Sequence, residues 1–82
     1  MPAVHRIKDI DTNRDRTVQG SDNVFVNGIG ASRLGDADQN GDVIVTGSRS
    51  VFVNGKKIAR IGDRDNKSHV KITGSANVTA GG

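Results

Sequence analysis

A repeat of 27 residues is the feature that most constrains the fold of this chain. The pentapeptide Val-Phe-Val-Asn-Gly occurs at 24–28 and again at 51–55, and the same offset aligns charged, glycine and valine residues along the whole sequence. The aligned sets include Arg6, Arg33 and Arg60; Asp9, Asp36 and Asp63; Asp11, Asp38 and Asp65; and Val24, Val51 and Val78. A fixed period of this kind is typical of a fold built from one repeated supersecondary unit. We therefore predict a single domain, 1–82, of three units at about 2–28, 29–55 and 56–82.

Each unit has the pattern of short β-strands. In segments 43–46 and 70–73 a period of two places Val43/Val45 and Val70/Ile72 on one face and Ile44/Thr46 and Lys71/Thr73 on the other, which is typical of a half-buried strand. Gly-Ser pairs at repeated positions indicate turns. No segment shows a helical stripe, so we expect an all-β fold.

The Asn-Gly sequences predict β-hairpins. Asn27-Gly28 and Asn54-Gly55 each follow Val-Phe-Val directly. Asn-Gly is the preferred two-residue hairpin turn because both residues tolerate positive φ. Returning strands are expected over 29–34 and 56–61.

The two ends of the sequence predict a closed ring. The third unit ends at 80–82 without a returning strand, and the offset of 27 places that strand at 3–7. We therefore expect the last strand to pair with the first, since an open solenoid needs distinct capping repeats and none is visible. The expected shape is a compact pseudo-threefold cone or prism of three β-hairpin repeats. Its equivalent units would present the same surface to each subunit of a symmetric trimer.

The apolar content is low for a chain of this length. Only 33% of the 82 residues are hydrophobic, and Phe25 and Phe52 are the only aromatic residues. Small scaffolds usually need disulfides, a metal or a partner to be stable. With no cysteine, disulfides and thiolate metal sites are excluded, which leaves a metal bound by oxygen or imidazole, or a partner protein.

Charge and hydropathy exclude several classes of function. The net charge is +3, but the basic residues are scattered and no aromatic residues interleave with them, so solvated surface charge is favoured over nucleic-acid binding. The first nine residues lack the apolar core of a secretory signal peptide, and no apolar run approaches the ~20 residues of a membrane span. No Ser–His–Asp or paired-glutamate arrangement indicates catalysis. We expect synthesis in the cytoplasm and, for any export, transport by a machine or virion.

The repeated motif resembles the PAAR-repeat family. The clearest copy, at 54–63, contains Asn-Gly, a tetrad ending in Arg, and then Ile-Gly-Asp; a second copy occupies 27–36 and a third, with Lys8 in place of Gly, occupies 1–9. The pattern is similar to the phage-baseplate branch in particular. The resemblance implies a pointed cone of three β-hairpins whose base sits on the β-helix of a trimeric spike protein and whose apex pierces a membrane.

The resemblance also implies a function and a set of partners. It predicts a non-enzymatic spike-tip protein, one copy per spike trimer, that contacts the target membrane transiently and binds no nucleic acid or small-molecule substrate. Its location would be a virion tail tip or the spike of a type VI secretion apparatus, and the sequence leaves this choice open. Because the chain ends with its third repeat, no fused effector domain is expected. The alternative function is a calcium-binding β-repeat module.

The hairpin segments are the predicted spike-binding residues. Alternation places their valine pairs on one side and Phe25, Phe52 and Thr79 on the other, and the sequence leaves open which side is core. Ordinary core packing is the alternative for all seven residues, and it is favoured for the first valine of each hairpin segment. The seven residues are Val24, Phe25, Val26, Val51, Phe52, Val53 and Val78.

The repeated arginines are predicted to be structural. They are the common element of the family's tetrad, whose other positions are degenerate at 30–33 and 57–60. We expect them to tie neighbouring loops together through the repeated carboxylates. These residues are Arg6, Arg33 and Arg60 with Asp9, Asp36 and Asp63.

A metal site is the last candidate. The family usually binds a structural zinc near its apex through His and Cys, but this chain has no Cys, and neither His5 nor His69 recurs in the other units, so that site is not expected. Asp11, Asp38 and Asp65 stand where the family often places a metal-binding His and would jointly hold one Ca²⁺ or Mg²⁺ near the apex. The favoured alternative is that these carboxylates cap β-turns by accepting local backbone hydrogen bonds.

Overall fold

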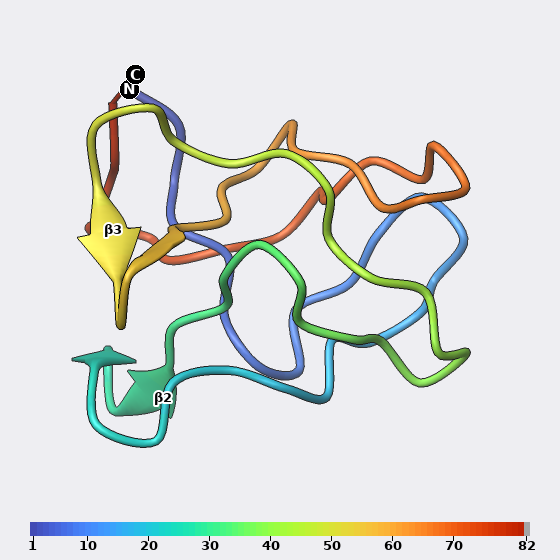
Figure 1. Cartoon of the computed structure of the whole chain (residues 1–82), viewed down its shortest axis with the longest axis horizontal. Coiled ribbons are helices and arrows are strands. Elements are labelled where there is room, and N and C mark those ends of the chain that lie inside the picture. The colour runs from blue at the N-terminus through green and yellow to red at the C-terminus, as the bar shows by residue number, and fades with distance from the viewer. Residues whose placement is uncertain (82) are drawn as a thin grey trace.

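The two Val-Phe-Val-Asn-Gly segments form β-hairpins in the computed structural model, which describes residues 1–81. Strand β1 (Phe25–Val26) pairs antiparallel with β2 (Ile29–Gly30), and β3 (Phe52–Val53) pairs antiparallel with β4 (Lys56–Lys57). In the two turns the Asn φ angles are 56° and 54° and the Gly φ angles 76° and 77°, as the type I′ turn requires. The predicted hairpins and the all-β class are confirmed, and Figure 1 shows both hairpins at one side of the molecule.

The prediction of continuous returning strands over 29–34 and 56–61 is wrong. After β2 ends at Gly30, Ala31 bridges to Arg6, and Arg33 then bridges to Ile58. The chain changes partner every one or two residues because it winds past different segments in turn. Most of the pairing is therefore made by isolated antiparallel bridges. Within residues 1–81 there is no helix, and so none that is long and apolar enough to cross a membrane.

The first and last segments of the described chain lie side by side. Ala3 forms an antiparallel bridge to Thr79, Val4 N donates to Val78 O at 2.9 Å, and Ala80 N donates to Pro2 O at 3.0 Å. Figure 1 shows the two ends of the chain together. The predicted pairing of the terminal segments is present, while Gly82, the last residue of the third predicted unit, lies outside the described residues.

Three backbone hydrogen bonds connect the three units in a closed cycle. Ser32 N donates to His5 O, Ala59 N donates to Ser32 O, and His5 N donates to Ala59 O, at 3.0, 2.9 and 3.0 Å. The three residues are 27 positions apart and are fully buried. The third bond joins the first unit to the last, which an open array of repeats does not allow. The pseudo-threefold symmetry itself remains a prediction.

The apolar core consists of two sets of residues that are each related by the offset of 27. It lies beneath the hairpins and the paired termini, and the partly buried Val51 packs against it. The first set comes from the segments that lead into the closed cycle, and the second from the hairpins and the last strand. The two sets are Val4, Ala31 and Ile58, and Val26, Val53 and Ala80.

The molecule has two different ends. Figure 1 shows the hairpins and the termini at one end, and three turns near residues 13, 40 and 67 at the other. We call the first the hairpin end (24–28, 51–55 and 78–81 with 1–3) and the second the loop end (11–15, 38–42 and 65–69). Apolar residues fill the interior at the hairpin end, whereas buried aspartates fill it at the loop end.

Candidate functional site

Large apolar side chains are exposed at the hairpin end. Phe25 is 59% exposed and Phe52 is 54% exposed, while Val26 and Val53 point into the core. The phenylalanine side of the hairpin is thus the outer side, which the sequence left open. Where the third unit has Thr79 in place of phenylalanine, the exposed Met1 side chain lies beside it, with its sulfur 3.7 Å from the threonine hydroxyl oxygen.

Core packing, the favoured alternative for the first valines, holds for only one of them. Val51 is partly buried against the core, but Val24 and Val78 are each 37% exposed. The backbone N–H of each of the three valines donates to the serine hydroxyl of its own unit, so this bond does not distinguish Val51 from the other two.

An arginine and an aspartate form an ion pair in each unit. The shortest contacts are Arg6 Nε to Asp9 Oδ2 at 2.9 Å, Arg33 Nη2 to Asp36 Oδ1 at 2.9 Å, and Arg60 Nε to Asp63 Oδ2 at 3.1 Å. In each pair the carboxylate also accepts a bond from the backbone N–H of its arginine. Each ion pair therefore closes its own loop. The carboxylates of two pairs also accept a hydrogen bond from another unit, Asp9 from the Thr73 hydroxyl and Asp63 from the Thr46 hydroxyl, so these two pairs connect neighbouring units as well.

The hydrogen bonds within these pairs stabilise the charged forms of both the aspartate and the arginine. Burial acts to raise the pKa of Asp9, but hydrogen bonds from Arg6 and Thr73 outweigh burial and hold that pKa below its usual value. The hydrogen bond and charge of Asp36 raise the pKa of Arg33. Both groups remain ionised at neutral pH, in agreement with a structural role.

Serine and asparagine make a further contact between neighbouring units. Ser21 Oγ donates to Asn54 Oδ1 at 2.8 Å, and Ser75 Oγ donates to Asn27 Oδ1. Arg33 Nη1 also donates to Asn54 Oδ1, at 3.0 Å. In the third instance of the pattern, Ser48 Oγ donates to the backbone carbonyl of Gly81, which stands 27 positions after Asn54. The sequence interpretation treated the Gly-Ser pairs only as turns, although the repetition of both residues at one offset was a signal for this contact.

His5, whose backbone is part of the closed cycle, carries a buried, neutral imidazole. Its Nδ1 is 2.8 Å from the carbonyl oxygen of Thr73, which only accepts, so Nδ1 carries the proton and Nε2 accepts from the Thr17 hydroxyl at 2.7 Å. Burial lowers the pKa of His5, and the bond to Thr73 and the charge of Asp9 offset this only in part. Protonation would place a positive charge in this buried site, where it loses its hydration.

We expect the stability of the protein to fall as the pH is lowered from 7 to 5. The pKa of His5 is below its ordinary value of 6.5 in the folded state, so below that pH the unfolded chain takes up a proton that the folded chain does not. The contribution of the neutral His5 to the free energy of unfolding is fully present above pH 6.5 and is lost progressively as the pH falls below it. The melting temperature, measured across this range, should depend less on pH in a His5→Gln variant; an unchanged dependence would assign the effect to other groups.

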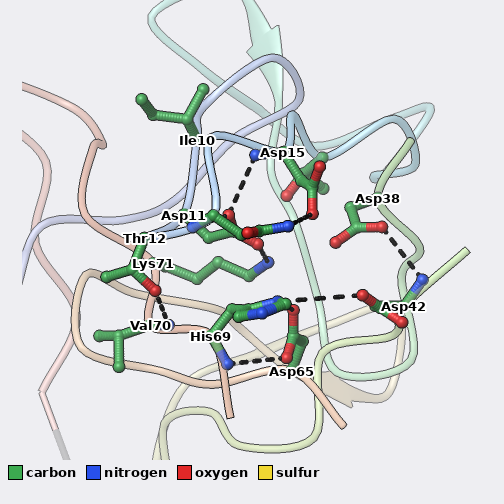
Figure 2. Close-up of polar contacts among 12 residues, drawn as sticks. Ile10, Asp11, Thr12, Asp15, Asp38, Asp42, Asp65, His69, Val70 and Lys71 are labelled. Atoms are coloured by element: carbon green, nitrogen blue, oxygen red, sulfur yellow. Dashed lines mark hydrogen bonds and ion pairs between the residues drawn. The ribbon is translucent and has the colours of Figure 1, made fainter. Parts of the chain in front are cut away.

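Buried carboxylates gather at the loop end. Asp11, Asp38 and Asp65 are at most 3% exposed, and one oxygen from each lies within 4.8 Å of the others. Asp15, Asp42 and His69, which are also related by the offset of 27, surround them (Figure 2). The structure thus brings the three predicted metal ligands together, with three further side chains around them. We call these six residues the loop-end cluster.

The three inner carboxylates of the cluster, those of Asp11, Asp38 and Asp65, use their two oxygens in different ways. Asp11 Oδ1 accepts from the backbone N–H of Asn13 at 2.8 Å and of Asp15 at 3.0 Å. Asp38 Oδ1 and Asp65 Oδ1 accept the equivalent two bonds in their own loops. The turn capping predicted as the favoured alternative is therefore present, but it uses only Oδ1.

The Oδ2 atoms of the three aspartates differ in their surroundings. Asp65 Oδ2 lies 3.1 Å from His69 Nδ1, and Asp11 Oδ2 lies 3.6 Å from Lys71 Nζ. Within residues 1–81 Asp11 Oδ2, Asp38 Oδ2 and Lys71 Nζ have no hydrogen-bond partner, so the contact between Asp11 and Lys71 is an ion pair without a hydrogen bond. Burial acts to raise the pKa of Asp65, but backbone bonds from His69 and Lys67, together with the His69 side chain, hold that pKa below its usual value.

The surface has an open groove of about 430 Å³. Among its ionisable residues, Arg33 and Asp36 are paired with each other, which leaves Lys56. No serine, threonine or histidine is among its lining residues, which are Ile7, Val18, Gln19, Gly20, Arg33, Gly35, Asp36 and Lys56. The groove thus offers neither a hydroxyl nucleophile nor an imidazole base.

These features define a small all-β structural module with an apolar end and a charged end. A family model described as the PAAR motif matches residues 16–66, which include both hairpins and two of the three Arg–Asp pairs. The chain belongs to the PAAR motif family, as the sequence motifs predict. A comparison with curated proteins finds no match.

Membership of this family supplies the general class of function. Proteins with the PAAR motif are structural rather than enzymatic and are associated with the spike tips of type VI secretion systems and phages. They sit on a spike partner. The chain is accordingly a structural component of this kind.

Proposed function

We propose that this protein is a non-enzymatic tip that caps the blunt end of a trimeric β-helical spike, with one copy per trimer. The hairpin end faces the spike and the loop end faces outward, toward a membrane that the spike crosses. The observation that carries the proposal is the exposure of Phe25 and Phe52 at one end of the molecule, directly over its apolar core.

The apolar hairpin end fits a protein partner. Exposed clusters of large apolar side chains mark interaction surfaces, and aromatic residues are enriched among those that contribute most to binding. Phe25, Phe52 and the Met1–Thr79 pair come from three different parts of the sequence and lie over the same core. Each would contact one subunit of a trimer.

The three units are proposed to lie around a pseudo-threefold axis that coincides with the spike axis. Support comes from the closed cycle of hydrogen bonds among His5, Ser32 and Ala59, and from ion pairs at the same place in every unit. The loop end, with its buried charges and many backbone hydrogen bonds, would form the outward point. We extend the proposal to the phage-baseplate branch of the family, on the strength of the Asn-Val-Phe-Val-Asn-Gly pattern.

We expect co-expression with a cognate trimeric spike protein to yield a complex with one copy of this chain per trimer. A closed chain of three similar units has one face for three identical subunits, so a second copy finds no site. Size-exclusion chromatography with light scattering measures the ratio. Recovery of the chain only as a free monomer with several candidate spikes, or at three copies per trimer, would contradict the proposal.

A further inference from the structure

Lys71 is a lysine with almost no exposure to solvent. Its side chain is 1% exposed, and its Nζ lies 3.6 Å from Asp11 Oδ2, whose carboxylate is also fully buried (Figure 2). Lysine is almost never fully buried unless it is paired, because the charged form loses its hydration. The residues at the equivalent positions in the other units are Thr17 and Ile44, which are as deeply buried. The position is therefore an interior one in every unit, and only the third unit fills it with a charge.

At three positions in or next to the loop end the third unit has a basic residue where the other two units do not. Position 67 is lysine where the other units have asparagine, position 69 is histidine where they have aspartate, and position 71 is lysine where they have threonine or isoleucine. Each of the three basic side chains lies against a carboxylate of the loop-end cluster. The contacts are Lys67 Nζ to Asp42 Oδ1 at 3.6 Å, His69 Nδ1 to Asp65 Oδ2 at 3.1 Å, and Lys71 Nζ to Asp11 Oδ2 at 3.6 Å.

The zinc that the family often carries does not fit these residues. Structural zinc is held by cysteine and histidine, whereas the loop-end cluster offers five carboxylates and one imidazole. The ammonium group of Lys71 stands beside one of the inner carboxylates and would repel a divalent cation. An oxygen-bound Ca²⁺ or Mg²⁺ would face the same repulsion.

We propose that Lys71 is a built-in cation that takes the place of a metal at the loop end. The chain supplies the positive charge that the buried carboxylates need, chiefly through Lys71, with Lys67 at the edge of the cluster and the His69 ring in contact with Asp65. The loop end would then be held by internal ion pairs and would fold without any metal. Removing the ammonium group should convert the cluster into a site that requires an external divalent cation.

The test compares the melting temperature of the wild-type protein and of a Lys71→Met variant, each in EDTA and in millimolar Ca²⁺. Methionine keeps most of the apolar stem and removes only the charge. We expect the wild-type melting temperature to be the same in EDTA and Ca²⁺ within about 2 °C. The variant should melt on the order of 15 °C lower in EDTA, because an unpaired buried carboxylate remains, and should regain about 5 °C or more in Ca²⁺ through binding to the folded state.

Ile44→Met is the matched control, since it places the same side chain at the equivalent buried position without changing a charge. Its melting temperature should be within a few degrees of that of the wild type and should be the same in EDTA and in Ca²⁺. A loss of wild-type stability in EDTA would overturn the proposal, because the native cluster would then hold a metal. A Lys71→Met variant that is as stable as the wild type and does not respond to Ca²⁺ would also overturn it.

A double variant keeps the test decisive if Lys71→Met does not fold. Asp11→Asn combined with Lys71→Met removes both partners, so no unpaired charge remains at this pair. We expect the double variant to fold and to melt well above Lys71→Met alone. A double variant no more stable than Lys71→Met would show that Lys71 does not act as the counter-ion of Asp11 and would overturn the proposal.

Discussion

Replacement of both Phe25 and Phe52 by aspartate should abolish binding to the trimeric spike while leaving the protein folded. Both side chains are more than half exposed, so they contribute little to the core. At a protein interface a buried aromatic side chain typically contributes about 2 kcal/mol or more, and two of them correspond to roughly a thousand-fold in affinity. The new carboxylates would also be buried against the spike without a partner, which adds to the loss.

The measurement is the affinity of each variant for the purified spike trimer, together with its melting temperature. The matched control replaces Val45 and Ile72 by aspartate, since these side chains are 45% and 46% exposed and belong to segments outside the hairpin end. The control should bind the spike as the wild type does. Retained binding by the phenylalanine variant, or loss of binding only in the control, would place the spike contact on the side of the molecule instead.

The features that sequence alone predicted are local or repeated ones. The type I′ turns at Asn27-Gly28 and Asn54-Gly55 follow from two adjacent residues, and the structure contains both. The pairing of the terminal segments followed from an offset of 27, because a unit without a returning strand needs one from elsewhere. Both inferences need only residue identities and spacing, so neither depends on how side chains pack.

Residue identities and spacing could not predict which side of each hairpin points into the core. Alternation separates Phe25 from Val26 but does not say which of them points inward, and with 33% hydrophobic residues neither side is marked by composition. The structure places Val26 and Val53 in the core with Val4, Ala31 and Ile58, and leaves Phe25 and Phe52 outside it.

The buried lysine shows a second limit. Alternation placed Ile44 and Lys71 on the same face of their strands, and the structure buries both. A lysine at such a position is ordinarily expected to reach solvent. Its burial depends on Asp11, which is 60 positions earlier in the sequence, and only the closed arrangement of the units brings the two together.

Replacement of Gly74 by alanine should cause a large loss of stability. A Cβ at this position would lie 2.6 Å from the carbonyl oxygen of Val4, which is backbone and accepts a hydrogen bond from Ser75 N at 2.8 Å. The clash requires the two backbone segments to separate, and such overpacking costs about 3 kcal/mol. For a domain of this size the melting temperature would fall by roughly 15 °C.

Gly28→Ala is the control for this prediction. A Cβ at Gly28 meets nothing within 4 Å, so the only cost is its positive φ of 76°, about 1 kcal/mol. Thermal or urea unfolding of both variants measures the difference, and a Gly74→Ala variant no less stable than Gly28→Ala would contradict it. Because Gly74 contacts the segment that closes the ring, hydrogen exchange should also increase at Ser75 and Ala80, whose N–H groups bond to Val4 and Pro2. If the exchange increased only at the loop end, the terminal pairing would not be what the substitution disturbs.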